Sequence, residues 1–122
     1  MISFLQRGSV LPALAFALFP ASAVAQDGGT LFKSRCAICH SVEPGGKSTL
    51  GPNLSGIAGR AAASGSYTYS SALKKANIRW DARSLELWLA GPSKMVPGSK
   101  MVMAVANAGE RKKIVSYLAT LK

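Results

Sequence analysis

The sequence predicts an all-α protein that folds as one small domain, and three observations lead to this prediction. Four segments begin with a residue that commonly caps a helix and continue with apolar residues three or four positions apart. No segment shows the alternation of polar and apolar residues that is typical of a β-strand. The pentapeptide Cys36-Ala37-Ile38-Cys39-His40 further indicates one covalently attached group, around which we expect about four helices and long loops to fold.

The first 25 residues have the pattern of a cleaved secretory signal peptide. Arg7 is the only charged residue before an apolar run over 10–19, and the small residues at 23–25 match an A-x-A cleavage site. We therefore expect a signal peptide over 1–25 and a mature single domain over 26–122. An uncleaved membrane anchor is the alternative, although the run is short for a spanning helix and prolines interrupt it.

The cysteine count and the charge indicate where the mature chain works. Both cysteines lie in the pentapeptide, so none remains for a structural disulfide, and export to a bacterial periplasm is the natural inference. Without Arg7, 14 of the 15 Lys and Arg residues remain against 5 Asp and Glu, which lowers the formal net charge from +10 to +9. Such a charge attracts acidic partners. Nucleic acid is the competing interpretation, but no helix-turn-helix, zinc-finger or RNA-binding signature accompanies the charge.

The pentapeptide at 36–40 is the attachment pattern of a c-type haem. Two thiols add to the two vinyl groups of the macrocycle, and the imidazole of His40 ligates the iron. A thioredoxin-like dithiol would need a strand-rich context, which the sequence lacks. A zinc site would need four ligands, but the chain has 2 cysteines and 1 histidine. The sequence therefore predicts one haem c attached through Cys36 and Cys39.

Helices are expected at both ends of the mature chain. Asp27 can cap a first helix that runs to about Cys39, in which Gly28 and Phe32 share a face. A glycine is costly inside a helix unless another helix comes close. The last helix, capped by Asn107, is the plausible partner, with an apolar stripe of Ile114, Tyr117, Leu118 and Leu121. We expect these terminal helices to pack against each other.

Long loops and two short helices are expected between the terminal helices. Residues 41–69 are rich in glycine, proline and small residues, and so long a loop makes sense in a small domain if it wraps the haem. A short helix is predicted at about 70–77, and Asp81 caps another that stops at Gly91-Pro92. From 92 to 103 we expect extended chain.

A haem that transfers electrons needs a second axial ligand, because an open position invites oxygen or peroxide. His40 is the only histidine, so a second histidine ligand is excluded. Methionine is the other common ligand, and three candidates lie close together: Met95, Met101 and Met103. In an extended segment Met101 and Met103 point the same way, so only one of them can reach the iron. The residue types alone leave the choice open.

Together these features resemble the class I cytochromes c, the soluble monohaem carriers of mitochondria and bacteria, over essentially the whole mature chain. The resemblance rests on three motifs in order: the pentapeptide, Gly51-Pro52-Asn53-Leu54, and Pro97-Gly98-Ser99-Lys100-Met101. It implies that Met101 is the second iron ligand beside His40, and that the carbonyl of Pro52 accepts a hydrogen bond from His40. It also implies haem propionate contacts from Arg60, Tyr69 and Trp80.

Several positions depart from the family pattern. Trp88 stands where a family tyrosine bonds the sulfur of the methionine ligand, so that bond is lost unless another group supplies it. Leu73 stands where mitochondrial members carry a buried amide, and Met103 stands where many members have an aromatic residue at the haem edge. We expect the fold to be unchanged, whereas the reduction potential does not carry over.

The resemblance implies a periplasmic one-electron carrier that shuttles electrons between redox complexes of a respiratory or photosynthetic chain, and not an enzyme. Its expected partners are acidic docking faces of redox proteins, such as a cytochrome bc complex, a terminal oxidase, a reaction centre or a periplasmic dehydrogenase. A monomer without stable membrane insertion fits this role. The residues expected to surround the exposed haem edge are Lys33, Arg35, Lys47, Lys94 and Lys100. The alternative is a haem peroxidase or small-ligand sensor, in which the sixth position is labile or open.

Overall fold

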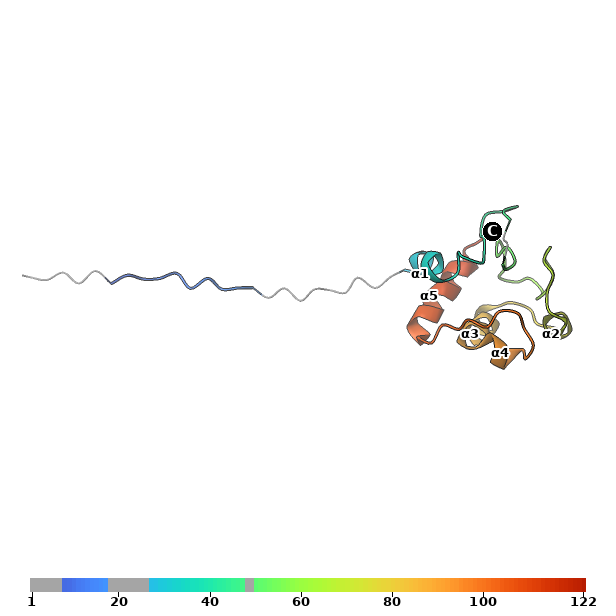
Figure 1. The fold of residues 1–122 in the computed structure, drawn as a ribbon. Helices are drawn as coiled ribbons and strands as arrows, with labels where there is room; N and C mark the ends of the chain where they lie inside the picture. Colours follow the sequence, from blue (N-terminus) through green and yellow to red (C-terminus); the bar gives the residue numbers. More distant parts are fainter. Residues whose placement is uncertain (1–7, 18–26, 48–49) are drawn as a thin grey trace, which may run out of the picture.

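In the ranges that the structure describes, the domain has five helices and no β-strand. The computed structural model describes residues 8–17, 27–47 and 50–122. In chain order the helices are α1 (Gly28–Arg35), α2 (Ser71–Lys75), α3 (Ala82–Ala90), α4 (Pro92–Met95) and α5 (Ala108–Ala119), as Figure 1 shows. Over these ranges the sole strand-like pairing is an isolated bridge between Ala61 and Arg79. The prediction of an all-α fold is confirmed.

The apolar run near the N-terminus is exposed in its described part. Residues 8–17 form neither helix nor strand, and Val10, Leu11 and Phe16 are 88–92% exposed. Arg7 and the predicted cleavage site at 23–25 lie outside the described residues. Among the residues that are described, no helix is both long enough and apolar enough to cross a bilayer.

Side-chain caps fix the starts of four helices. In each case the capping oxygen accepts a hydrogen bond from the backbone N–H three residues later, at 2.7–3.1 Å. These bonds satisfy N–H groups that have no partner inside the first turn of a helix. The capping residues are Asp27, Ser70, Asp81 and Asn107. All four helices therefore start where the sequence predicted.

The end of α1 differs from the prediction. This helix ends at Arg35, one turn before Cys39, because the N–H groups of Cys36 and Ala37 both donate to the carbonyl of Phe32. Such a wide closing turn satisfies the last carbonyls and stops the helix. The two cysteines consequently lie in a turn and not in the helix.

The expectation of extended chain after Gly91 was wrong for residues 92–95, which form the one-turn helix α4. Pro92 occupies the first turn of this helix, where its fixed φ angle is favourable and its missing N–H would have no partner anyway. The pair Gly91-Pro92 therefore ends α3 and begins α4. A proline that stops one helix gives the same local signal as a proline that starts the next.

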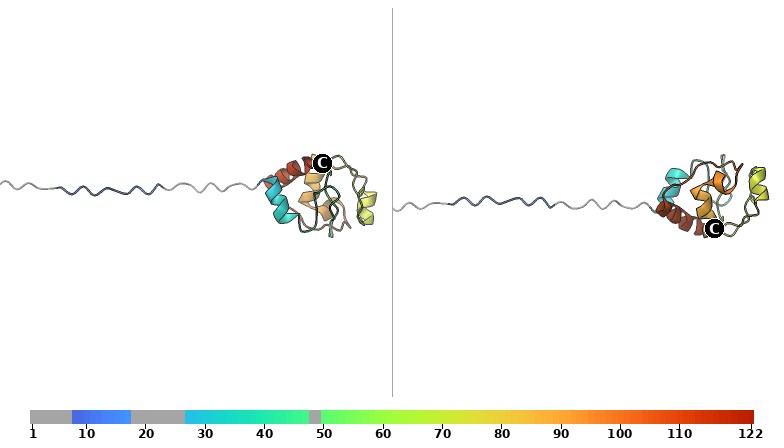
Figure 2. Two further views of the ribbon diagram at one scale, coloured as in Figure 1. Left: turned by 90° about the horizontal axis from the view of Figure 1, so that it is seen from above. Right: turned by 90° about the horizontal axis from the view of Figure 1, so that it is seen from below.

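The terminal helices pack tightly against each other, as predicted, and Figure 2 shows α1 lying across α5 from two sides. A side chain at Gly28 would overlap the backbone carbonyl of Lys113 on α5, so glycine is what permits the close approach. Phe32 is buried and contacts Tyr117 with ring centroids 5.5 Å apart. Ile114 is fully buried.

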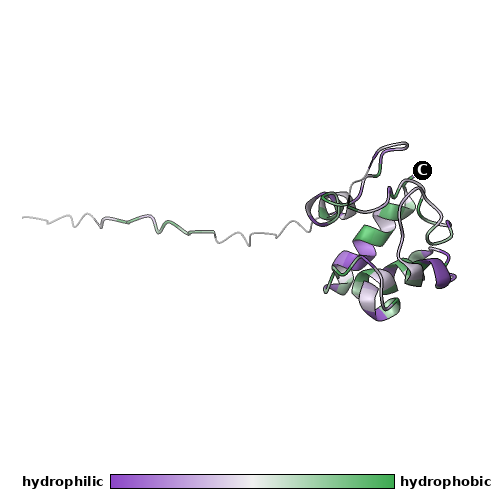
Figure 3. Cartoon of the chain, turned by 45° about the vertical axis from the view of Figure 1, so that its right-hand side comes forward, coloured by the Kyte–Doolittle hydropathy of each residue, from purple (hydrophilic) through white to green (hydrophobic). Residues whose placement is uncertain are grey.

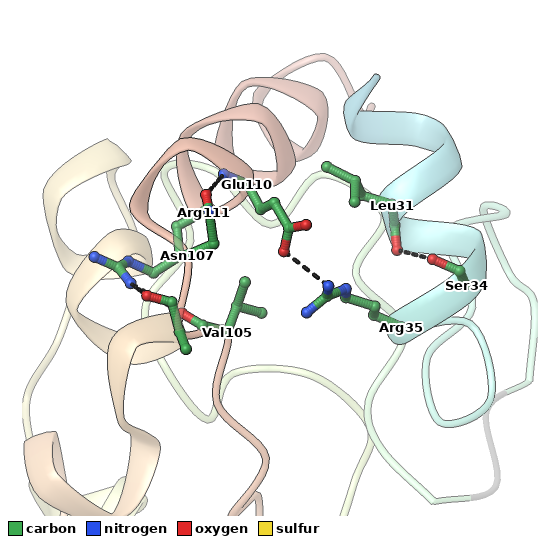
Figure 4. A network of polar contacts seen from close by, with 8 residues as sticks. Leu31, Ser34, Arg35, Val105, Asn107, Glu110 and Arg111 are labelled. Atoms are coloured by element: carbon green, nitrogen blue, oxygen red, sulfur yellow. Dashed lines mark hydrogen bonds and ion pairs between the residues drawn. The ribbon is translucent and has the colours of Figure 1, made fainter. Parts of the chain in front are cut away.

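Polar contacts from α5 hold both α1 and the segment that precedes α5. Arg35 at the end of α1 forms an ion pair with Glu110 of α5 at 2.8 Å (Figure 4). Arg111 donates to the carbonyls of Val105 and Ala106, both at 2.9 Å, and so holds the segment that enters α5.

Helix α3 completes the core by packing against α5. Its Leu85 and Leu89 are buried, and the carbonyl of Leu89 accepts a hydrogen bond from the N–H of Val105 at 2.7 Å. Figure 3 shows hydrophobic and hydrophilic residues interleaved along the helices, as expected where each helix buries one side.

Candidate functional site

One cavity of the described domain has a volume of about 340 Å³ and is lined mainly by apolar and aromatic side chains. Its walls come from the end of α1, the loop over 50–70, helix α3, the segment after α4, and α5. This cavity gathers every residue that the sequence assigned to the haem: Cys36, Cys39, His40, Pro52, Arg60, Tyr69, Trp80 and Met101. Residues 65 positions apart in the sequence thus share one site.

The two cysteines enter the cavity from the turn that follows α1. The N–H groups of Cys39 and His40 both donate to the carbonyl of Cys36, at 3.1 and 3.0 Å. This tight turn places two thiols and one imidazole on the wall of the same cavity. Burial raises the pKa of the Cys36 thiol, so this group is protonated at neutral pH.

His40 is held in one orientation. Its Nδ1 lies 2.7 Å from the carbonyl oxygen of Pro52. Because a carbonyl can only accept, Nδ1 carries the proton and Nε2 keeps a free lone pair. Burial lowers the pKa of the His40 imidazole more than the hydrogen bond to Pro52 raises it, so the ring is neutral at pH 7. A side chain at Gly51 would come within 2.6 Å of the ring, and glycine therefore allows this close packing.

The sulfur of Met101 has a hydrogen-bond donor of its own. The indole N–H of Trp88 lies 3.3 Å from Met101 Sδ and donates to it. The sequence predicted that a bond to this sulfur is lost at Trp88 unless another group supplies it, and the structure shows that the Trp88 indole supplies it. The signal was present in the residue type, because tryptophan always offers one N–H donor. Leu73 is half-buried and adds an apolar group to the cavity wall.

The three candidate methionines lie in different surroundings. Met95 does not line the cavity, whereas Met101 and Met103 both do. Met101 is half-buried, and its backbone carbonyl accepts a hydrogen bond from the buried Ser99 hydroxyl at 3.2 Å. Met103 is 41% exposed.

Polar atoms of the loop over 50–70 approach the cavity from another side. Arg60 donates to the carbonyls of Ser55 and Asn53 at 3.0 and 3.3 Å, and its buried Nε has no partner among the described residues. The hydroxyl of Tyr69 accepts from the N–H of Gly65 at 3.1 Å and retains its own proton for another acceptor. A buried donor without a partner costs about 1–3 kcal/mol, so an acidic group on a bound molecule would be well placed here.

Exposed apolar side chains lie at the rim of the cavity. Ile38, Leu50 and Val102 are 80%, 64% and 75% exposed, and all of them also line the cavity. Besides Arg60, two cations line the cavity, Arg35 and Lys100. Both are engaged within the chain, Arg35 with Glu110 and Lys100 with the carbonyl of Thr68.

These donor groups fit a haem c. An apolar cavity suits the macrocycle, two thiols suit its vinyl groups, and a neutral imidazole and a thioether suit its iron. The partnerless Nε of Arg60 and the free hydroxyl proton of Tyr69 suit its propionates.

Sequence similarity to known proteins also indicates a protein that binds haem c. The Cytochrome c family model matches residues 25–122. A cytochrome c of Kluyveromyces lactis is 42% identical over 93 residues, which cover 75% of this chain and 84% of that protein. A cytochrome c of Chlamydomonas reinhardtii is 40% identical over 105 residues, covering 84% of this chain and 93% of that protein. A cytochrome c2 of Rhodoblastus acidophilus is 36% identical over 98 residues, covering 79% and 92%.

The family model matches four-fifths of the sequence, and the relatives align over most of their own length. Both findings assign the chain to the same family. Members of this family carry one covalent haem c, and the two cysteines of this chain have the required spacing. The chain belongs to the cytochrome c family and binds one haem c through Cys36 and Cys39.

Proposed function

We propose that this cytochrome c is an exported carrier that moves single electrons between redox proteins of the periplasm, with His40 and Met101 as the two iron ligands. Electron transfer is the function of the family to which the chain belongs. The bound haem supplies an iron that cycles between the ferric and ferrous states. The protein's part is to hold both ligands, exclude water and present the haem to a partner.

The residues around the cavity suit this task. The Pro52 carbonyl holds His40 so that Nε2 remains free to ligate. Met101 offers a neutral thioether, which favours the ferrous state and so raises the reduction potential. Neither ligand has to gain or lose a proton when the electron arrives.

The observation that carries the proposal is the hydrogen bond between Trp88 and Met101, which holds a sulfur inside the same cavity as His40. A peroxidase or gas sensor needs a sixth position that opens, and peroxide chemistry also needs an acid–base group beside the iron. No Asp or Glu lines the described part of the cavity, and His40 is its only histidine. The carrier is therefore the better-supported proposal.

The far-red charge-transfer band that reports methionine sulfur on ferric haem tests the ligand assignment. Because Met103 also lines the cavity, the comparison is best made between Met103→Leu and the double variant Met101→Leu/Met103→Leu. We expect the band in Met103→Leu and its loss in the double variant. A band that is absent from Met103→Leu or retained in the double variant would refute Met101 as the ligand. Ready binding of carbon monoxide or azide to the wild-type protein would favour the sensor alternative.

The docking surface is proposed to be the cavity rim with the cations around it, and its partners to be redox proteins with acidic faces. Apolar side chains at the rim can exclude water from the contact, while the positive charge of the chain attracts the partner over a longer range. The ring of cations comprises Lys33, Arg35, Lys47, Lys94 and Lys100, all of which are exposed. Since Arg35 and Lys100 hold other parts of the chain, the remaining lysines are the better targets for a test.

Charge reversal tests this docking surface. Lys33→Glu/Lys47→Glu should slow electron delivery to an acidic redox partner at low ionic strength. Lys75→Glu/Lys112→Glu carries the same change in charge outside the proposed ring and should slow it less. The difference should vanish near 1 M salt, where the screening length is about 3 Å. Equal rates for the two double variants at low salt would refute the docking surface.

The mass of the protein recovered from a bacterial periplasm tests export. The full chain should yield a haem protein that begins at Gln26. A haem protein that keeps residues 1–25 and fractionates with membranes would support the anchor instead.

A further inference from the structure

The three methionines of the domain differ in how far solvent reaches them. Met103 is 41% exposed, and its neighbours Val102 and Ala104 are exposed as well. Met95 and Met101 are half-buried, and the sulfur of Met101 already has a hydrogen-bond donor. A small oxidant in solution attacks a thioether that it can reach. Met103 is therefore the methionine that such an oxidant meets first.

Met103 also lies where the chain is proposed to meet its redox partner. It lines the cavity beside Ile38, Leu50 and Val102, and all four side chains are between 41% and 80% exposed. A partner that docks on this rim removes water from these apolar side chains. An atom added to the sulfur of Met103 would therefore be enclosed in the contact.

Oxidation of the sulfur would change the chemistry of the rim. A thioether is apolar, whereas a sulfoxide carries a polar oxygen that accepts hydrogen bonds and donates none. The exposed cations of the cavity lining, Arg35 and Lys100, are engaged with Glu110 and the carbonyl of Thr68. A polar group that is enclosed without a partner is unfavourable. A sulfoxide at this position would therefore weaken docking.

The backbone on both sides of Met103 is fastened independently of its side chain. Upstream, the Ser99 hydroxyl donates to the carbonyl of Met101 at 3.2 Å. Downstream, the N–H of the fully buried Val105 donates to the carbonyl of Leu89 at 2.7 Å. A change at the exposed Met103 side chain should therefore leave Met101 in place.

We propose that Met103 is a modification site, at which peroxide converts the thioether to a sulfoxide and slows docking of the carrier while its iron ligands stay in place. The inference deepens the proposed function and rests on its docking surface. A sulfur lone pair attacks one oxygen of hydrogen peroxide, and the O–O bond breaks. The proton of the transferred oxygen passes to the departing hydroxide, which leaves as water. Sulfur loses two electrons and peroxide gains them, and a sulfoxide reductase with a thiol as reductant reverses the change.

Peptide mass spectrometry of the ferric holoprotein after treatment with dilute hydrogen peroxide locates the modified sulfur. Trypsin cleaves after lysine and arginine, so Met95 lies on the peptide 95–100, while Met101 and Met103 share the peptide 101–111. Fragmentation of the shared peptide separates its two methionines. We expect the added oxygen on Met103 first, with the far-red band unchanged. Oxygen found first on either of the other two methionines would overturn the proposal.

The rate of electron delivery to an acidic redox partner at low ionic strength shows what the modification does. Each protein is compared with its own untreated sample. The wild type should become about tenfold slower after peroxide treatment and recover after incubation with the reductase. Met95→Leu leaves the rim unchanged and should respond like the wild type. Met103→Leu, which keeps an apolar side chain without sulfur, should retain its own untreated rate.

Three results would overturn the oxidation step. They are a wild type that keeps its rate when Met103 is oxidised, a Met103→Leu variant that slows as much as the wild type, and a far-red band that fades in step with the rate. An error in the docking surface shows itself before any peroxide is added, as equal rates for Lys33→Glu/Lys47→Glu and Lys75→Glu/Lys112→Glu. That result would refute the docking surface and the proposal with it, so the two failures are distinguishable.

Discussion

The contact between α1 and α5 and the segment that carries Met101 are held by different forces. The helix contact is made by buried apolar side chains and by a glycine that lets two backbones approach, with Leu31 at 1% and Phe32 at 2% exposure. The methionine segment has no helix or strand, and individual hydrogen bonds from Ser99 and Trp88 fix it. The first region should therefore determine stability, whereas the second should determine ligand geometry at little cost in stability.

The largest expected effect is on the helix contact. Leu31→Ala would empty a fully packed position on α1 that does not line the cavity, and should lower the free energy of unfolding by about 2–5 kcal/mol. The far-red band of the protein that remains folded should be unchanged. Denaturant unfolding of the holoprotein measures the first quantity and visible absorption the second. Ser116→Ala, at an exposed position of the partner helix α5, should change the free energy by no more than about 0.5 kcal/mol.

The two regions also differ in how far the sequence predicts them. The spacing of Gly28, Phe32, Ile114 and Tyr117 follows the helical period, so the packing of α1 on α5 could be predicted from the residues alone. The partner of Trp88 could not be predicted from the residues alone, because Met101 is 13 residues away and the path of the chain between them is irregular. Only the family resemblance placed Trp88 beside the methionine sulfur. Helix α4 was missed for a local reason, since Gly91-Pro92 is equally typical of a helix end.

Which residues form the candidate site could be predicted in part. The family resemblance that the three motifs carry was enough to name Cys36, His40, Pro52 and Met101, because each motif is local in the sequence. The partnerless Nε of Arg60 and the engagement of Lys100 with Thr68 depend on contacts between loops. No periodic pattern encodes such contacts, so they appear only in the folded chain.

A smaller effect is expected where backbone approach, not apolar volume, makes the helix contact. Gly28→Ala would place a methyl group against the Lys113 carbonyl and 2.8 Å from Cβ of Tyr117, and should cost about 1–3 kcal/mol of unfolding free energy. Gly29→Ala is the matched control, since its new methyl group would have no neighbour closer than 3.5 Å. That variant should be neutral or more stable by up to about 1 kcal/mol. Equal stability of the two variants would contradict the close-approach explanation.

For the segment that carries Met101 we expect the opposite result, a small loss of stability together with a change in the haem spectrum. Ser99→Ala removes the hydroxyl that holds the Met101 carbonyl and should lower the free energy of unfolding by only about 1 kcal/mol. It should nevertheless weaken the far-red band and increase azide binding, because Met101 is held less firmly. Ser99→Thr keeps the hydroxyl and should resemble the wild type in both measurements. A stability loss without any spectroscopic change would remove the distinction between the two regions.

The smallest expected effect is the dependence of the free energy of unfolding on acid pH, through the two carboxylates that cap helices. The pKa values of Asp27 and Asp81 are lowered in the folded chain, first by hydrogen bonds from the backbone N–H groups of Thr30 and Ser84, respectively. A carboxyl group with a lower pKa in the folded state stabilises that state above its unfolded pKa of about 3.9, and this contribution is lost as the pH falls through the folded pKa. Asp81→Asn still accepts the capping bond but has no charge to lose. The stability difference between wild type and Asp81→Asn should therefore shrink from pH 5 to pH 2.

Since Asp27 and Asp81 do not line the cavity, the far-red band at pH 5 should be the same in both proteins. A stability difference that stays constant over this pH range would show that the charge of the cap is irrelevant. A difference in the far-red band would show that helix capping and the segment that carries Met101 are coupled.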